Sequence, residues 1–359
     1  MSRPSLTCVD LRAGDVWERV LAEAADHDVY HLRQYHALAE ACGEGSPLLL
    51  VYREGAHLLL FPLLVRDVRE APRLRDWQGE LHDATSVYGY PGPVYAGPGL
   101  TDEVREGFRA AMGEELRRRR IVTVFSRLNP LIPMQRDVLR GTGELQQSGT
   151  TVSIDLSLPE EAQLAQYRTN HRRDIARLRK LGAECRQDPA RLLEFAAIYR
   201  STMSRVGASP GYLFSDEYFV RLMKELGEAA SLWMVTIGDE ALCGGIFFHH
   251  RGRIQYHLGG THEAHVNRGP TKLMFDAVRA WGSSRGMRSL HLGGGLGGRE
   301  DSLFAFKAGF SDLRHEFWTF RWVLDEEAYE GLRRAAGCEE TVPGSSSGDA
   351  FFPAYRKPL

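Results

Sequence analysis

The chain has 359 residues, of which 45 are Lys or Arg and 47 are Asp or Glu, so its formal net charge is only −2. Such a balance excludes binding to nucleic acid through the overall field, and any such contact must come from local basic patches. This length exceeds what one hydrophobic core usually supports and therefore predicts two domains.

The five cysteines are scattered along the chain, and no two stand at the spacing of a metal site or a redox motif. The 13 histidines form no ligand-spaced set either. No apolar run approaches the roughly 20 residues of a membrane-spanning helix, and the N-terminus lacks a signal-peptide pattern. We therefore expect a cytoplasmic protein with reduced thiols, no metal and no membrane span. The sequence leaves its oligomeric state open.

Each half of the chain contains one predicted β-hairpin. The first joins residues 48–52 to residues 57–61, where Pro62 is expected to stop the second strand. The second joins residues 232–237 to residues 241–249 through a turn at Gly238. Helical segments precede both hairpins, and in both halves a further strand leads into a crossover helix. This order is the plan of the acetyltransferase fold, and its repetition indicates a duplication.

The expected fold class is therefore α/β, with two tandem GNAT-like (acyl-CoA N-acyltransferase-like) domains whose mixed sheets are flanked by helices. We place the first domain at residues 1–155 and the second at residues 156–325. Residues 343–348 read as a flexible loop, and the aromatic residues 351–355 indicate that the C-terminal segment, 326–359, docks back on the first domain.

A strongly basic helix is predicted at residues 168–180, ending before Gly182. Only Ile175, Leu178 and Ala176 are available to face a core, so its other faces are cationic. Such a face suits a polyanion such as tRNA, and a solvated charged surface is the alternative. The residues expected to contact tRNA from this helix are Arg168, Arg172, Arg173 and Arg177.

The most specific pattern lies between residues 254 and 310. A strand at residues 254–260 leads through Arg268, Gly269 and Pro270 into a helix, and a second strand at residues 289–292 runs into a glycine-rich stretch, residues 293–298. A short helix with the motif Phe-x-Phe-Lys-x-x-Phe, centred on Lys307, follows. This order resembles the second domain of the FemABX family, aminoacyl-tRNA-dependent transferases that form amide bonds and are built from two acetyltransferase-like modules.

The resemblance implies roles for several residues. Lys307 corresponds to the lysine that stabilises charge on the transferred group or the tRNA end, and Arg205 to an arginine that holds the anionic part of the acceptor. Tyr88 and Tyr90 stand in a segment that resembles the Tyr-Gly-Gly-Pro lining of the acceptor site, and Asp301 is a further expected substrate contact. Residues 95–97 and 37–40 lack the aspartate and the lysine of the cell-wall enzymes, which argues against UDP-linked peptidoglycan precursors.

Tyr256 and His257 lie on the strand that borders the donor site in this fold. Alternation places one of them in the site and the other in a layer interface, and the sequence does not decide which. A histidine there is a candidate proton acceptor, and a packing residue is the alternative. Gly294 and Gly295 suit an anion-binding backbone nest with Arg299 beside it, although a plain flexible loop fits the same residues. We expect Gly294, Gly295, Arg299 and Arg268 to be further contacts of the tRNA.

The turn at residues 267–270 discriminates between two acyl donors. Acyl-CoA-dependent members of this fold usually carry an Arg/Gln-x-x-Gly-x-Gly/Ala turn whose N–H groups bind the diphosphate. Here Pro270 removes one such donor. We therefore expect an aminoacyl-tRNA as co-substrate, a small amine as acceptor and no bound cofactor. The alternatives are an N-acyltransferase that binds CoA at Arg268 and Gly269, and a module that binds tRNA or a sugar-linked ligand without turnover.

Overall fold

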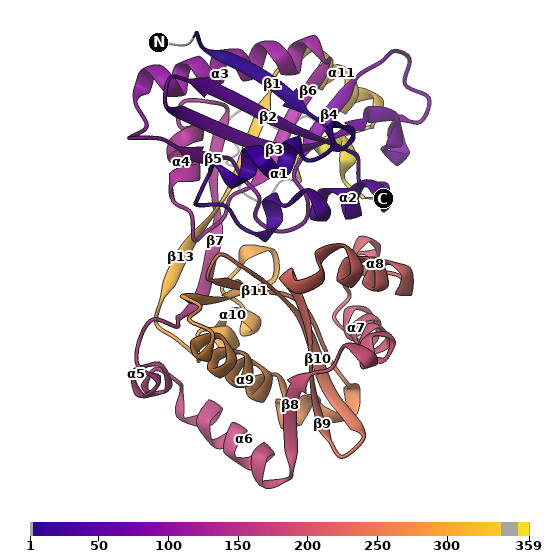
Figure 1. Ribbon diagram of the computed structural model, residues 1–359. Helices are drawn as coiled ribbons and strands as arrows, with labels where there is room; N and C mark the ends of the chain where they lie inside the picture. The colour runs from indigo at the N-terminus through magenta and orange to yellow at the C-terminus, as the bar shows by residue number, and fades with distance from the viewer. Residues whose placement is uncertain (1–2, 339–350, 359) are drawn as a thin grey trace. The chain divides into compact units, whose positions relative to one another are not determined.

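The computed structural model describes residues 3–338 and 351–358, so the loop expected at residues 343–348 lies outside the described residues (Figure 1). The chain divides into two compact units. Unit 1 comprises Met1–Ser148 and Glu316–Leu359, and unit 2 comprises Gly149–His315. These limits differ from the sequence-based limits at residues 155 and 325.

Unit 1 contains the expected order of helix, hairpin, strand, crossover helix and strand. Its strands lie in the order β1-β2-β3-β4-β6-β13, and β4 and β6 are parallel because α3 connects them as a crossover. The elements of the repeat are α2 (Arg33–Ala41), β2 (Ser46–Glu54), β3 (His57–Asp67), β4 (His82–Thr85), α3 (Asp102–Arg118) and β6 (Ile121–Arg127). The others are β1 (Ser5–Val9), α1 (Val16–Ala22), β5 (Val94–Ala96), α4 (Met134–Leu139) and α11 (Glu326–Ala335).

Unit 2 repeats this order, with its strands arranged β7-β12-β11-β10-β9-β8. The repeat consists of α7 (Leu192–Arg205), α8 (Asp216–Leu226), β9 (Ala230–Ile237), β10 (Glu240–His250), β11 (Arg253–Thr261), α9 (Thr271–Ser284) and β12 (Ser289–Gly293). Around it lie α5 (Glu160–Ala165), α6 (Thr169–Lys180), β8 (Ala183–Gln187) and α10 (Ser302–Lys307). Both predicted hairpins and the basic helix are confirmed.

Two long strands explain where the units divide. β7 (Glu144–Asp155) pairs with β12 of unit 2 from Val152 to Asp155, although most residues before it belong to unit 1. β13 (Arg314–Val323) pairs with β6 of unit 1 from Thr319 to Val323. Each half of the chain thus supplies the last strand of the other unit's sheet, which is why residues 316–325 lie in unit 1.

Pro62 does not stop the first hairpin, contrary to the prediction. It lies inside β3, opposite Leu49 of β2. On the other side of β3, residues 58–60 pair with β5 and residues 64–67 pair with β4. Pro62 therefore falls between two partners, where its missing N–H group breaks no ladder hydrogen bond.

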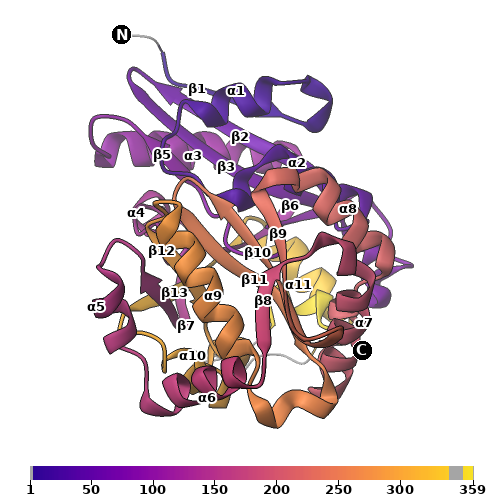
Figure 2. The ribbon, with the colours of Figure 1, turned by 60° about the horizontal axis from the view of Figure 1, so that its bottom comes forward.

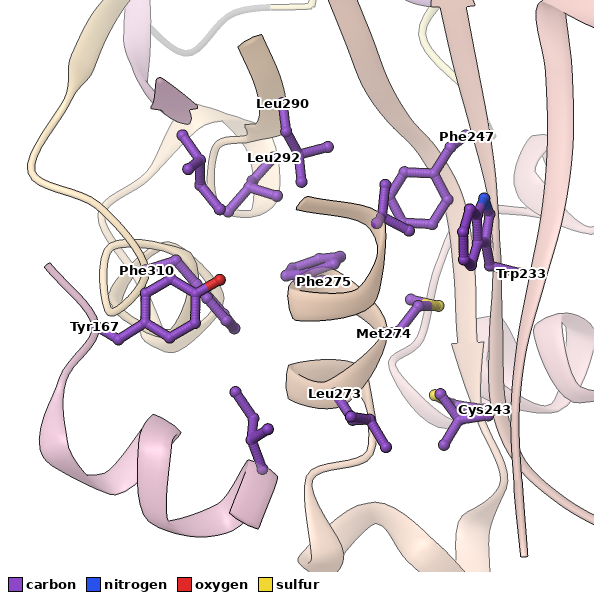
Figure 3. Packing of buried hydrophobic residues seen from close by; sticks show 14 of the residues in the cluster. Tyr167, Trp233, Cys243, Phe247, Leu273, Met274, Phe275, Leu290, Leu292 and Phe310 are labelled. Atoms are coloured by element: carbon purple, nitrogen blue, oxygen red, sulfur yellow. The ribbon is translucent and has the colours of Figure 1, made fainter. Parts of the chain in front are cut away.

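The core of unit 2 lies between its sheet and α9. Figure 1 shows α9 on one side of β9, β10 and β11, and α7 with α8 on the other. Met274 and Phe275 leave α9 in different directions, Met274 towards Trp233 of β9 and Phe275 towards Phe310, with ring centroids 5.4 Å apart in the second pair (Figure 3). These side chains exclude water from the layer that carries α10.

Candidate functional site

The parallel strands β11 and β12 separate at one end. Their pairing runs from Arg253↔Ser289 to Gln255↔His291 and stops there, although β11 continues to Thr261 and β12 to Gly293. The carboxyl ends of adjacent parallel strands are where ligands bind in many α/β sheets. Tyr256 and the glycine loop, residues 294–298, therefore flank a natural position for a substrate.

Lys307 reaches this position from the last residue of α10. Its side chain is buried, with only 7% of the residue exposed, and Nζ donates a hydrogen bond of 2.7 Å to the carbonyl oxygen of Gly294. Nζ also lies 5.8 Å from the centroid of the Tyr256 ring. Burial lowers the pKa of Lys307 from its usual 10.5 to about 8, and Asp301 opposes part of that shift. The ammonium form therefore still predominates at neutral pH.

Asp301 holds the glycine loop in place. Its carboxylate caps α10 by accepting from the backbone N–H of Phe304 at 2.9 Å, and it accepts from Leu296 N at 3.0 Å. Burial raises the pKa of Asp301, but these backbone donors outweigh burial and leave the pKa below its usual value. A Cβ atom at Gly295 would lie 2.4 Å from the Asp301 Oδ1 atom, so only glycine fits at that point. We infer that Asp301 acts on the loop, whereas the sequence suggested a substrate contact.

Tyr256 faces the same layer as Lys307. Its ring packs on Phe275 of α9 with centroids 4.8 Å apart, and the side chain is half-buried. A Cβ atom at Gly259 would lie 1.8 Å from the Tyr256 hydroxyl oxygen. The hydroxyl group therefore lies over Gly259, along β11 towards its carboxyl end.

His257 points to the other face of the sheet. Its ring stacks on Phe248 of β10, with centroids 4.0 Å apart, and the residue is 9% exposed. Burial lowers the pKa of His257 to about 3. An imidazole of such low basicity is poorly suited to accept a proton from an amine near neutral pH, so this environment favours the packing role that the sequence left open.

The four predicted tRNA contacts on α6 and at its N-cap, Arg168, differ in what they contact. Arg172, Arg173 and Arg177 are exposed, and we call them the basic face of α6. Arg177 Nη2 lies 3.5 Å from the carbonyl oxygen of Arg268, so this face continues to the exposed Arg268 at the start of α9. Arg168 instead donates to the carbonyl oxygen of Ala305 in α10 at 3.1 Å.

The sequence analysis missed His171 and misplaced Ala176. Ala176 is exposed, whereas His171 is 3% exposed and packs with Ile175 and Leu178 against the core. Its spacing from those two residues, four and seven positions, is the usual stripe of a half-buried helix and was the available signal.

In the turn before α9, backbone N–H groups donate to carbonyl oxygens of the same turn. Gly269 adopts a left-handed conformation with φ of 64°, Pro270 is the N-cap, and Thr271 is the first helical residue. The N–H groups of Lys272 and Leu273 donate to the carbonyl oxygens of Gly269 and Pro270. Because both N–H groups already donate to carbonyl oxygens of the turn, they are not available to bind a diphosphate.

The remaining predicted residues lie elsewhere. Arg205 is exposed at the end of α7 and donates to the carbonyl oxygen of Thr261, where β11 ends, at 3.2 Å. Arg299 is exposed directly after the glycine loop, and its Nε donates to the carbonyl oxygen of Leu296 at 3.3 Å. Tyr88 and Tyr90 belong to unit 1: the Tyr88 carbonyl accepts from the Tyr35 hydroxyl at 2.9 Å, and Tyr90 packs edge-on against Tyr30.

The sequence of unit 2 is similar to a known protein family. Residues 165–306, which contain α6, α9, both separating strands and most of α10, match the model of the acetyltransferase (GNAT) domain. The chain has a GNAT-like fold. The match supports an acyltransferase, and it leaves the acyl donor open. No curated protein matches the chain significantly.

Solved structures extend the GNAT-like fold to nearly the whole chain. A crystal structure of FemX is 14% identical, covering 91% of this chain and 99% of that one, with a TM-score of 0.66. The C-terminal domain of a putative lysylphosphatidylglycerol synthetase from Agrobacterium fabrum is 12% identical (90% and 99% covered, TM-score 0.52). A tandem GNAT protein from the clavulanic acid biosynthesis pathway is also 12% identical (89% and 98% covered, TM-score 0.50). Such identities show a shared fold alone.

The described residues contain neither a helix that could cross a membrane nor a cluster of metal ligands. No helix among them combines the length and apolar character that crossing a bilayer requires. Within the same residues, no three His, Cys, Asp or Glu side chains gather as a metal site would need.

Proposed function

We propose that this protein is an acyltransferase that moves an aminoacyl group from a charged tRNA to a small amine or amino-acid-like acceptor and forms an amide bond. The observation that carries the proposal is the buried ammonium group of Lys307, which lies where β11 and β12 separate. A cation buried at that position suits a reaction in which negative charge develops on a carbonyl oxygen.

The proposed reaction needs no covalent intermediate on the protein. The neutral amine attacks the carbonyl carbon of the ester that joins the amino acid to the terminal ribose of the tRNA. A C–N bond forms and the C–O ester bond breaks, and the proton lost by the amine ends on the released ribose hydroxyl. The ester is already activated, so the protein has to orient both reactants and stabilise the tetrahedral oxyanion.

Lys307 is the residue proposed to stabilise the oxyanion. Its ammonium has three N–H donors, and the bond to the Gly294 carbonyl uses one of them. The Tyr256 hydroxyl, held along β11 above Gly259, is the neighbouring group proposed to orient the acceptor amine. Asp301 is a weak base because its pKa is lowered, and it is proposed to act only through the glycine loop.

The basic face of α6 supports tRNA as the donor. Arg172, Arg173 and Arg177 are exposed on the helix that also contacts α10, and Arg268 continues their surface. A row of exposed arginines suits a phosphate backbone longer than the diphosphate of CoA. The engaged N–H groups of Lys272 and Leu273 also argue against a CoA diphosphate at the start of α9.

Two alternatives remain for this fold. The match to an acetyltransferase domain favours an acyl-CoA-dependent N-acyltransferase. The resemblance of the sequence to the FemABX family raises a peptidoglycan-precursor aminoacyltransferase, which the residues at positions 37–40 and 95–97 disfavour. The proposed donor would place the reaction in the cytoplasm.

The deciding experiment incubates the protein with total tRNA charged with labelled amino acids and a panel of small amines, with product masses as the readout. Parallel reactions contain RNase, or acetyl-CoA in place of tRNA. We expect an amide product that requires charged tRNA and disappears with RNase. Acetylated product without tRNA, together with acetyl-CoA binding by calorimetry, would establish the first alternative. Binding of tRNA without any product across the panel would identify a module without turnover.

A further inference from the structure

The helix that carries Lys307 is too short to hold its own position. α10 spans only Ser302–Lys307, and isolated helices shorter than about 12 residues are marginal in water. Asp301 caps its first turn, but Lys307 is the last residue, at the opposite end. The orientation of that end therefore depends on what its carbonyl groups contact.

Two residues at the start of α6 contact three carbonyl groups at this end. Arg168 Nη1 donates to the Ala305 oxygen at 3.1 Å, and the Arg168 backbone N–H donates to the Gly309 oxygen at 2.8 Å. His171 Nε2 lies 3.0 Å from the Phe306 oxygen. These carbonyls belong to residues within two positions of Lys307, and carbonyls at a helix end are normally satisfied by such donors. The Phe306 oxygen also accepts from the backbone N–H of Gly309 at 3.1 Å. We call Arg168 and His171 the α10 clamp.

The ring of His171 is held in this contact by the residues packed around it. Its ring packs edge-on against Phe310 at 4.6 Å and lies 5.5 Å from Phe306. A Cβ atom at Gly309 would lie 2.6 Å from Nε2, so the chain after α10 touches the ring directly. Burial lowers the pKa of His171, with Lys272 and Arg168 acting in the same direction and the Phe306 carbonyl and Asp174 opposing it. The contact with the Phe306 oxygen is a hydrogen bond in the tautomer that carries its proton on Nε2.

The helix that bears the clamp is itself anchored. Asp174 of α6 accepts from Lys272 of α9 at 2.7 Å, and both side chains are largely buried. Arg179 pairs with the buried Asp276 of α9 at 2.7 Å. Figure 2 shows α6 lying beside α9 and α10. Ion pairs thus fix α6 relative to α9, and the clamp fixes α10 relative to α6.

We propose that Arg168 and His171 are positioning residues for Lys307: by satisfying the carbonyls of Ala305, Phe306 and Gly309 they keep the Lys307 ammonium on the Gly294 carbonyl. The inference rests on the proposed role of Lys307. It gives Arg168 a task other than the tRNA contact expected from the sequence.

The test compares His171→Phe, which keeps the ring packing but removes the donor, with His171→Gln, whose side-chain amide can restore it. Arg168→Met removes the guanidinium and keeps its apolar stem. We expect His171→Phe and Arg168→Met to lower kcat by about 10- to 100-fold, with unchanged KM for charged tRNA and unchanged affinity for uncharged tRNA. His171→Gln should recover most of the activity. Arg221→Met, an exposed arginine of α8, is the matched control and should behave as wild type.

A second readout needs no substrate. The rate at which acetic anhydride labels Lys307, followed by peptide mass spectrometry across pH, reports the pKa of its amine in each variant. Loss of the clamp should move that pKa from about 8 towards 10.5 because the ammonium becomes free to reach water. This arm stands even if the donor proves to be acyl-CoA, so it separates failure of the clamp from failure of the proposed function.

An unchanged Lys307 pKa and unchanged kcat in folded His171→Phe and Arg168→Met would overturn the proposal. Reduced tRNA affinity in Arg168→Met with a wild-type Lys307 pKa would make Arg168 a phosphate contact and overturn its part of the clamp. If His171→Phe does not fold, as judged by circular dichroism, Arg168→Met decides the question because Arg168 lies at the surface.

Discussion

Lys307 combines a full charge with nearly complete burial, and each property has a measurable consequence. Its ammonium contacts the Gly294 carbonyl and the Tyr256 ring, and the Asp301 carboxylate opposes the lowering of its pKa by burial. Structural lysines rarely occupy such sites, because a buried charge lowers stability unless it is paired. Strongly perturbed groups of this kind cluster at functional positions.

Replacing Lys307 with alanine should lower kcat by about 100- to 1000-fold, the usual effect of removing one oxyanion donor. KM for charged tRNA should change little, because the ammonium acts mainly on charge that develops during the reaction. Steady-state kinetics of Lys307→Ala beside Lys224→Ala, an exposed lysine of α8, measures the effect. Wild-type turnover in folded Lys307→Ala would remove this residue from the mechanism.

The pH dependence of kcat separates two roles for the same side chain. With a pKa of about 8, Lys307 is protonated below pH 8 and neutral above it. A cationic role requires the protonated form, so kcat should fall tenfold per pH unit above about pH 8. A rise in kcat through that pH would instead identify Lys307 as a general base. The profile should be recorded with an acceptor whose amine titrates well away from pH 8.

The free energy of unfolding should rise with pH over the range in which kcat falls. The folded-state pKa lies below the unfolded value of 10.5, so between about pH 8 and 10.5 the unfolded chain binds more protons and stability rises with pH. At pH 7 the cost of the buried charge is fully present, and Lys307→Met should raise the free energy of unfolding by up to about 3 kcal/mol. Denaturant titrations at pH 7 and pH 9.5 test this. If Lys307→Met raises the free energy of unfolding equally at pH 7 and pH 9.5, the buried charge is not the cause of the gain.

At the scale of elements, α6 presents different chemistry on its two sides. Its buried stripe of His171, Ile175 and Leu178 joins it to the core and to α10, whereas the arginines of its basic face are exposed. Asp174 forms long ion pairs of 3.7 Å with both Arg173 and Arg177, and it is bound more closely by Lys272, at 2.7 Å. The helix thus keeps its charge available for a polyanion.

Changing Arg172, Arg173 and Arg177 together to glutamine should weaken binding of uncharged tRNA and flatten its salt dependence. Three lost phosphate contacts lower the slope of log affinity against log salt by about 2 to 3. Fluorescence anisotropy between low and moderate KCl measures that slope. A control with Arg12, Arg118 and Arg221 changed to glutamine carries the same change of net charge on other elements. Equal slopes in the two triple variants would show that α6 is only a solvated charged surface.

At the scale of the whole molecule, segments that are distant in the sequence complete each unit, and residues from the end of the chain belong to unit 1. The last described residues return to unit 1, where the buried Asp83 binds Arg66 at 2.7 Å and Arg356 at 2.6 Å. Arg356 also donates to the Asp67 carbonyl at 2.6 Å, and Tyr355 is fully buried beside Thr123. Residues 351–358 therefore belong to unit 1, and Tyr355 lies in its core.

Arg356→Met should destabilise unit 1 by about 3 kcal/mol, because it leaves a buried carboxylate with half of its pairing. Lys357→Met, at the exposed neighbouring position, should change stability by less than about 0.5 kcal/mol. Thermal unfolding by circular dichroism compares the two variants. Equal stability of both variants and the wild type would show that the ion pair of Arg356 with Asp83 contributes nothing to the stability of unit 1.

The sequence by itself determined the elements and their order. Periodicity and turn residues predicted both hairpins, the basic helix and the crossover helix after β11, because these signals are local to each segment. The order of strand, turn, strand, glycines and lysine also indicated the acetyltransferase fold and singled out Lys307. Sequence reasoning failed at Pro62, because whether a strand tolerates proline depends on partners that are distant in the chain.

Only the tertiary structure decided how the candidate site is assembled. It placed Tyr256 rather than His257 beside Lys307, since strand alternation alone leaves the buried face undefined. It also revealed the clamp of Arg168 and His171 on α10, a contact between residues more than 130 positions apart. The exchange of β7 and β13 moved the unit limits away from those expected. Each of these outcomes depends on long-range packing, and a linear pattern of residues carries no information about which distant surfaces meet.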